Sequence, residues 1–107
     1  MKPANIKIKS NIQIPLDQIE TFCRKWKVRE LALFGSVLRE DFRPDSDIDV
    51  LVSFAPDGGI TFDNRVEMLD ELAEIFGRQV DLVQKAAIRN PFRRHDILTT
   101  KEVVYAA

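Results

Sequence analysis

The 107-residue sequence contains a single cysteine, Cys23, and a single histidine, His95. One cysteine excludes an internal disulfide framework and a metal site built from several thiolates. One histidine likewise excludes a metal site built from several imidazoles. Because proteins of reducing compartments rarely depend on disulfides, this cysteine usage favours a cytoplasmic location.

Long apolar runs are also missing. The longest stretches, Leu31–Phe34 and Val103–Ala107, are far shorter than the roughly 20 residues that cross a bilayer. The lysines near the N-terminus are not followed by an apolar segment, so we expect neither a signal peptide nor a membrane anchor.

The sequence has no excess of positive charge. Lysine and arginine total 16 and aspartate and glutamate total 17, which gives a net charge of −1. Proteins that bind duplex nucleic acid through its phosphates are usually basic, so direct nucleic-acid binding is not expected. With 45% hydrophobic and 31% charged residues, the composition is that of one soluble globular domain over residues 1–107.

Helix-like and strand-like segments alternate along the chain. Residues 1–14 alternate only weakly between apolar and polar, and we expect a short strand or a loose arm there. The periodicity predicts helices over 16–26, 61–76 and 91–98, a short helix over 36–40, and strands over 30–34, 47–54, 79–83 and 102–105. This order indicates an α/β layer (α+β in some classifications) with a small sheet.

Residues that commonly occur in turns and helix caps mark the ends of these helices. Pro15 suits the first turn of the helix over 16–26, and Gly77 suits the end of the helix over 61–76. Asn90 followed by Pro91 is a start signal for the last helix. Ser36 is expected to cap the short helix over 36–40.

Gly35 and Ser36 lie at a predicted strand-to-helix turn. Glycine lets the backbone approach a ligand closely, and the start of a helix presents free N–H groups and a positive dipole end. The Ser36 hydroxyl could add a hydrogen bond, and Arg39, one turn further on, could add charge. These three residues are therefore candidates for binding a phosphate.

Asp47 and Asp49 lie at the start of the strand predicted over 47–54, on the same side of it. Alternate residues of a strand are roughly 6.5–7 Å apart, so the two carboxylates repel unless a cation lies between them. Mg²⁺ commonly uses one or two carboxylates together with substrate phosphates. A pair of metal ions would fit this platform.

A third carboxylate, Asp81, interrupts the apolar run 80–83. A buried charge there would be costly unless it is exposed or compensated. If the strand over 79–83 lies beside the strand over 47–54, Asp81 can join the same metal site or act as a general base. Taken alone, each of these features is commonly an ordinary turn or a solvated face, and only their combination points to a site.

An EF-hand calcium loop is the competing motif for the aspartates. Asp45, Asp47 and Asp49 match its first, third and fifth positions. The motif then requires glycine and glutamate where this chain has Val50 and Pro56, so we reject it.

The remaining reactive or aromatic residues favour structural roles. Cys23 and Trp26 lie on the apolar stripe of their helix and are expected in the core, and Tyr105 is expected to pack. His95 is expected at the surface. The basic group Arg89, Arg93 and Arg94 is interpreted chiefly as a solvated face, with a phosphate or partner contact as the alternative; no role is assigned to Arg43.

The spacing of Gly35-Ser36, ten intervening residues and Asp47-x-Asp49 resembles the signature of the minimal nucleotidyltransferases of the DNA polymerase β superfamily. The resemblance runs through most of the chain. Many members have glycine after the arginine of the first motif, where this chain has Glu40. The matching segments are FGSVLREDF, SDIDVLVSF, the acidic helix over 61–76, GRQVDLV and DILTTKEVVYA.

The resemblance implies a small mixed sheet flanked by helices. It implies two Mg²⁺ ions held by Asp47, Asp49 and Asp81, with the triphosphate of ATP on Gly35 and Ser36. The implied reaction is transfer of a nucleoside monophosphate to an acceptor hydroxyl, with Asp81 helping to deprotonate the acceptor.

Among small members, the chain looks like the MntA-type antitoxins. Those add AMP to a tyrosine of an all-helical HEPN ribonuclease toxin, and a similar partner is implied here. Two other hypotheses remain open at this point. One is an antitoxin that masks its toxin without catalysis, and the other is a subunit that transfers a nucleotide to a small molecule of the aminoglycoside type.

Overall fold

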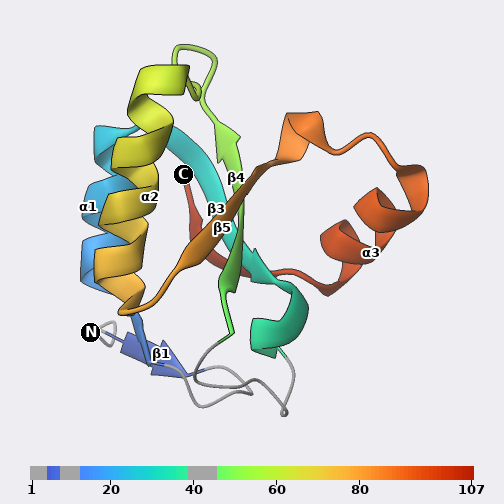
Figure 1. Cartoon of the computed structure of the whole chain (residues 1–107), viewed down its shortest axis with the longest axis horizontal. Helices are drawn as coiled ribbons and strands as arrows, with labels where there is room; N and C mark the ends of the chain where they lie inside the picture. Colours follow the sequence, from blue (N-terminus) through green and yellow to red (C-terminus); the bar gives the residue numbers. More distant parts are fainter. Residues whose placement is uncertain (1–4, 8–12, 39–45) are drawn as a thin grey trace.

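The computed structural model describes residues 5–7, 13–38 and 46–107. Helices and strands alternate through this part of the chain (Figure 1). In chain order they are β1 (Asn5–Lys7), β2 (Gln13–Pro15), α1 (Leu16–Lys25), β3 (Val28–Phe34), the 3₁₀ turn η1 (Gly35–Leu38), β4 (Ile48–Phe54), α2 (Phe62–Phe76), β5 (Val80–Gln84), the 3₁₀ turn η2 (Lys85–Ala87), α3 (Pro91–Thr100) and β6 (Glu102–Ala106).

The main sheet is mixed, with the strand order β5-β4-β3-β6. Strand β4 pairs parallel with β5, whereas β3 pairs antiparallel with both β4 and β6. Strands β1 and β2 form a separate two-stranded antiparallel ladder. The small mixed sheet flanked by helices is therefore confirmed, and part of the weakly patterned segment 1–14 contributes to β1 and β2.

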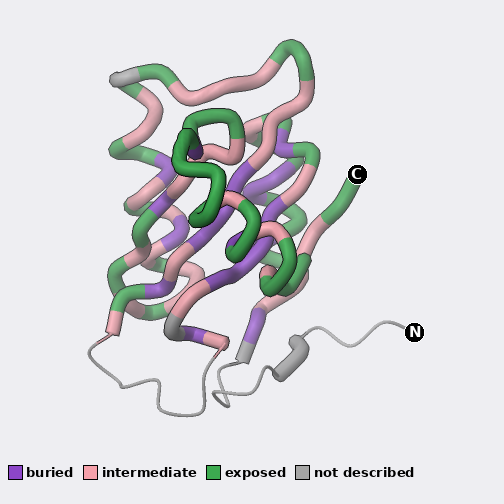
Figure 2. Tube along the Cα trace, turned by 90° about the vertical axis from the view of Figure 1, so that its right-hand side faces the viewer, coloured by how far each residue is buried: buried purple, intermediate pink, exposed green. Residues whose placement is uncertain are grey.

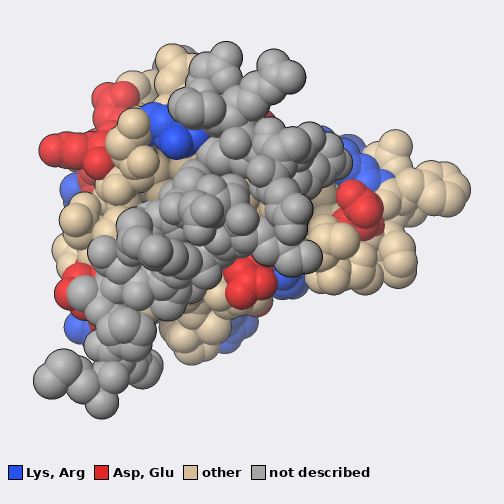
Figure 3. Space-filling view, turned by 90° about the horizontal axis from the view of Figure 1, so that it is seen from below, with Lys and Arg blue, Asp and Glu red and all other residues tan. Residues whose placement is uncertain are grey.

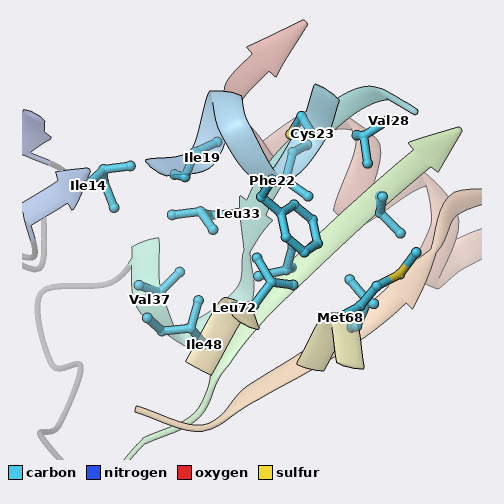
Figure 4. Packing of buried hydrophobic residues seen from close by; sticks show 14 residues of the cluster. Ile14, Ile19, Phe22, Cys23, Val28, Leu33, Val37, Ile48, Met68 and Leu72 are labelled. Atoms are coloured by element: carbon cyan, nitrogen blue, oxygen red, sulfur yellow. The ribbon is translucent and has the colours of Figure 1, made fainter. Parts of the chain in front are cut away.

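The two faces of the sheet are covered by different helices. Helices α1 and α2 lie side by side over one face (Figure 1), and the purple stretches in Figure 2 run along the central strands. On that face Phe22 and Leu72 pack with Leu33 and Ile48 (Figure 4). The opposite face carries a smaller cluster, in which Ile97 of α3 joins Ala32, Phe34, Leu51 and Ile88.

Strand β4 contributes apolar side chains to both helical layers. Ile48, Val50 and Val52 belong to the cluster on the α1–α2 side, and Leu51 belongs to the cluster on the α3 side. Asp49 shares the side of Leu51 because alternate residues of a strand point the same way. The strand therefore holds the Asp49 carboxylate on the α3 side.

The helix ends agree with the cap residues. The Thr61 hydroxyl accepts a hydrogen bond from the Asn64 N–H at 3.2 Å and so caps α2, which ends at Gly77 in the left-handed conformation. The Asn90 side chain accepts hydrogen bonds from the N–H groups of Phe92 and Arg93 and so begins α3. These caps satisfy backbone donors that the first helical turn leaves unpaired.

Most predicted boundaries are correct to within one residue, and three elements call for comment. Strand β3 begins at Val28, directly after the turn in which Lys27 has φ 57°. The short helix begins at Gly35 and is a 3₁₀ turn, so the prediction that Ser36 caps it was wrong. Helix α3 continues to Thr100. The remainder of the predicted short helix, residues 39 and 40, lies outside the described residues.

Trp26 is half-buried and lies where α1 meets α2. Its Nε1 donates a hydrogen bond to Glu71 Oε1 at 3.3 Å, and Lys25 Nζ forms an ion pair with Glu71 Oε2 at 2.8 Å. Tyr105 packs against the same core, and His95 is exposed. In the part of the chain that the structure describes, no helix is long and apolar enough to cross a membrane.

Cys23 has no solvent-exposed surface, and burial raises the pKa of its thiol to about 12. The folded state therefore holds this proton between pH 9 and 12, where the unfolded chain releases it. The contribution of Cys23 to the free energy of unfolding must therefore fall as pH rises through this window. The total loss is about 1.4 kcal/mol for each unit by which the folded pKa exceeds the unfolded pKa. We expect the free energy of unfolding to decline less steeply over pH 9–11 in Cys23→Ala than in the parent chain. Equal slopes in urea titrations of the two proteins would contradict this prediction.

Candidate active site

The parallel pairing of β4 and β5 brings Asp49 and Asp81 together. The register aligns Asp49 with Asp81, and Leu51 with Val83. Neighbouring strands lie about 4.8 Å apart, and aligned residues of a ladder project to the same face. Strand β5 therefore neighbours β4, which is the condition under which Asp81 can join the same site as Asp49.

Gly35 lies against Asp49 from the other side. Strand β3 ends at Phe34, which is aligned with Asp49 in the antiparallel ladder, and Gly35 follows with φ +74°. A Cβ built on Gly35 would overlap Oδ2 of Asp49 and lie 3.4 Å from its Cγ. Only glycine fits here, because both the backbone conformation and the space exclude a side chain.

The folded chain disfavours the charge of Asp49. Asp49 is half-buried, and burial raises its pKa, as do the nearby charges of Asp81 and Asp47, in that order. Arg93 of α3 acts in the opposite direction and lowers the pKa of Asp49. A bound cation would relieve this repulsion on Asp49.

Asp47 and Asp81 are both exposed, and Asp47 lies one residue before β4. Among the described residues, no three histidine, cysteine, aspartate or glutamate side chains are grouped closely enough to form a complete metal cage. The oxygen donors nevertheless fit Mg²⁺, which keeps several waters and is usually held by one or two carboxylates plus substrate phosphates. Asp49 and Asp81 supply such a pair in one register position.

Helix α3 forms a wall beside this face. A hollow of about 220 Å³ is lined by Gly35 and Leu38 of η1 and by Asp96 and Thr100 of α3. Sequence reasoning did not single out Asp96, and it interpreted Arg93 chiefly as solvated. No signal in the sequence distinguishes Arg93 from Arg89 and Arg94, because only the packing of α3 on the sheet brings one of them toward Asp49.

Not every predicted site residue can be placed. Ser36 lies in η1 directly after Gly35. Arg39, together with Glu40, Arg43 and Asp45, lies outside the described residues. Figure 3 views the molecule from below, at the end of the sheet where β4 begins, and the described atoms there show acidic and basic side chains interspersed.

A family model described as "Nucleotidyltransferase domain" matches residues 16–104, a range that contains β3, η1, β4 and β5. This chain belongs to that family. The nucleotidyltransferase domain thus includes Gly35, Asp49 and Asp81, the residues that the sheet brings together.

Two named relatives support the assignment of this chain to an enzyme type. Protein adenylyltransferase MntA of Thermococcus cleftensis is 32% identical over 81 residues, which cover 76% of this chain and 77% of that protein. A candidate protein adenylyltransferase of Methanocaldococcus jannaschii is 43% identical over 75 residues, which cover 68% of this chain and 72% of that protein. The chain is therefore an enzyme of the nucleotidyltransferase type.

Solved structures agree on the fold. A structure described as a minimal nucleotidyltransferase superposes with a TM-score of 0.65 at 28% identity and covers 80% of this chain and 85% of its own. A toxin–antitoxin complex with AMP-PNP contains a chain that superposes with a TM-score of 0.68 at 23% identity and covers 86% of this chain and 73% of its own. The latter identity is low, so that likeness supports the fold alone.

Proposed function

We propose that this chain is a Mg²⁺-dependent protein adenylyltransferase that moves AMP from ATP to a tyrosine hydroxyl of a HEPN-type toxin in the cytoplasm. The observation that carries the proposal is the parallel register that aligns Asp49 with Asp81, directly beside the backbone of Gly35. This arrangement joins an acidic cation site to a glycine turn where a phosphate can approach.

In this mechanism the oxygen of the acceptor hydroxyl attacks the α-phosphorus of ATP. A new P–O bond forms, the bond from the α-phosphorus to the bridging oxygen of the β-phosphate breaks, and pyrophosphate leaves. Asp81 takes the hydroxyl proton on its carboxylate, which its exposed position at β5 allows. Bound Mg²⁺, held by Asp47, Asp49 and Asp81, would offset the negative charge of the phosphates.

The triphosphate lies along the turn after β3. Gly35 has no side chain to obstruct it, and we assign Ser36 and Arg39 to phosphate binding on the strength of the motif. Asp49 depends on this neighbour, because any Cβ at position 35 would displace its carboxylate.

The proposed partner rests on the relatives. The related protein from Thermococcus cleftensis is named a protein adenylyltransferase, and one structure with the same fold contains a tri-AMPylated Shewanella oneidensis HEPN toxin in complex with an MNT antitoxin.

Intact-mass spectrometry tests the proposal. The protein encoded beside this chain is incubated with it, ATP and Mg²⁺, and its mass should rise by one or more AMP units. Peptide mapping should place each unit on a tyrosine, and EDTA should prevent the gain.

The double variant Asp47→Asn/Asp49→Asn is the control and should transfer nothing. If this variant modifies the acceptor as the parent chain does, the proposal is wrong. A stable complex without any mass gain would instead favour an antitoxin that acts by masking. Transfer to an aminoglycoside without any protein acceptor would favour the small-molecule alternative.

A further inference from the structure

Three arginines lie in or just before the first turn of α3, and they differ in what they contact. The guanidinium of Arg94 donates a hydrogen bond to the backbone oxygen of Lys85 at 2.9 Å, so it fastens α3 to the end of β5. Arg89 and Arg93 are exposed, and their side chains form no ion pair within the described residues. Arg93 alone of the three acts on the charge of Asp49.

The packing of α3 explains why Arg93 faces the site. Residues spaced by three, four and seven positions share one face of a helix, which places Arg93 with Asp96, Ile97 and Thr100. Ile97 packs with Leu51 on the side of the sheet that also carries Asp49. Asp96 and Thr100 line the hollow beside Gly35. One face of α3 therefore looks toward both halves of the candidate site.

Arg93 acts on the charge of Asp49, yet its side chain forms no ion pair within the described residues. A direct ion pair with Asp49 would neutralise the charge that a cation requires, and no such pair forms within 4.0 Å. The guanidinium therefore remains available to an anionic ligand. Its planar array of donors matches the geometry of phosphate oxygens, to which it can bind in bidentate fashion.

We propose that Arg93 binds the β- and γ-phosphates of the incoming triphosphate, across the site from Gly35. This inference rests on the proposed nucleotide substrate. It assigns a substrate-binding residue to α3, an element that carries neither the glycine–serine turn nor the aspartates. The α-phosphate lies at the carboxylates, where the reaction takes place. Arg93, which is beyond ion-pair distance of them, serves the outer phosphates.

The assignment gives α3 a role in discrimination between nucleotides. A monophosphate lacks the groups that Arg93 would contact, whereas a triphosphate gains a charge-assisted pair of hydrogen bonds. Arg93 should therefore favour ATP over AMP.

Equilibrium binding of α,β-methylene-ATP and of AMP, each with Mg²⁺, tests the inference without any acceptor protein. Arg93→Gln should weaken binding of the triphosphate analogue by about 10- to 100-fold and leave AMP binding unchanged. Arg93→Lys, which keeps the charge but not the planar array, should fall between the parent chain and Arg93→Gln. Thermal unfolding should be unaltered in both variants, because the Arg93 side chain is exposed and unpaired.

Arg89→Gln is the matched control, since it removes the same charge from an exposed position close in sequence. It should bind the analogue as the parent chain does. The inference is overturned if Arg93→Gln binds the analogue normally, if it weakens AMP and the analogue equally, or if Arg89→Gln has the same effect. If Arg93→Gln loses affinity for the analogue but the parent chain modifies no protein, the proposed function fails while this inference stands.

Discussion

Replacing Asp49 with asparagine should abolish nucleotide transfer and leave the metal-free fold at least as stable as before. Asp49 is half-buried, and its charge is opposed by burial and by Asp81 and Asp47. Asparagine keeps the shape and removes the repulsion, while the cation loses a ligand. We expect the transfer rate to fall on the order of a thousandfold.

The effect of Asp49→Asn on the stability of the metal-free protein should change with pH in one direction. A carboxyl whose folded pKa is raised costs stability once pH exceeds its ordinary range, because the folded chain must then carry a charge it disfavours. In metal-free protein, the advantage of Asp49→Asn in thermal unfolding should therefore grow as pH rises through that range. Mg²⁺ should raise the unfolding temperature of the parent chain and not that of the variant.

Asp70→Asn is the matched control, because Asp70 is exposed on α2, on the other side of the sheet. It should transfer AMP at the parent rate and respond to Mg²⁺ as the parent does. If Asp49→Asn retains transfer, or if Mg²⁺ stabilises it as much as the parent chain, the metal site is not where we place it.

Replacing Gly35 with alanine should cost far more than the same change at Gly77. Both glycines have positive φ, +74° and +72°, so both changes carry a backbone cost of about 1 kcal/mol. At Gly77 nothing lies within 4 Å of the added Cβ, whereas at Gly35 it overlaps Oδ2 of Asp49. The overlap should add about 1–3 kcal/mol of destabilisation and reduce transfer about a hundredfold by displacing the carboxylate.

A double-mutant cycle isolates this contact. The nearest atoms to the added Cβ belong to the Asp49 side chain, and the Asp49 Cβ itself lies at an ordinary 3.7 Å. Asp49→Ala should therefore remove most of the extra cost of Gly35→Ala when the free energies of unfolding are measured in urea. Additive effects of the two substitutions, or equal costs at Gly35 and Gly77, would contradict this account.

The elements of the fold were predictable because their signals are local. The helix over 61–76, the Gly77 cap and the Asn90–Pro91 start depend only on neighbouring residues, and all three are confirmed. The error at Ser36 has a local cause as well. The left-handed conformation of Gly35 lets the chain turn one residue earlier than a serine cap requires.

Strand pairing was not predictable from local signals. The sequence offers Asp81 as a charge within an apolar run, which is compatible with a surface position as well as with a site. Only the parallel register of β4 and β5 makes Asp81 the neighbour of Asp49, and that register depends on apolar packing across the whole sheet. The role of Asp81 as a base remains a prediction.

By itself, the sequence determined which chemical groups are available: a glycine turn, two aspartates separated by one residue, and a third aspartate within a strand. Spacing along the chain was sufficient for this, because a strand alternates its sides and a turn requires particular residues. The tertiary structure alone decided which groups meet. It placed Gly35 against Asp49, aligned Asp81 with it and turned one of three neighbouring arginines toward the site, because contacts between distant segments follow from burial of the apolar faces of β4 and α3.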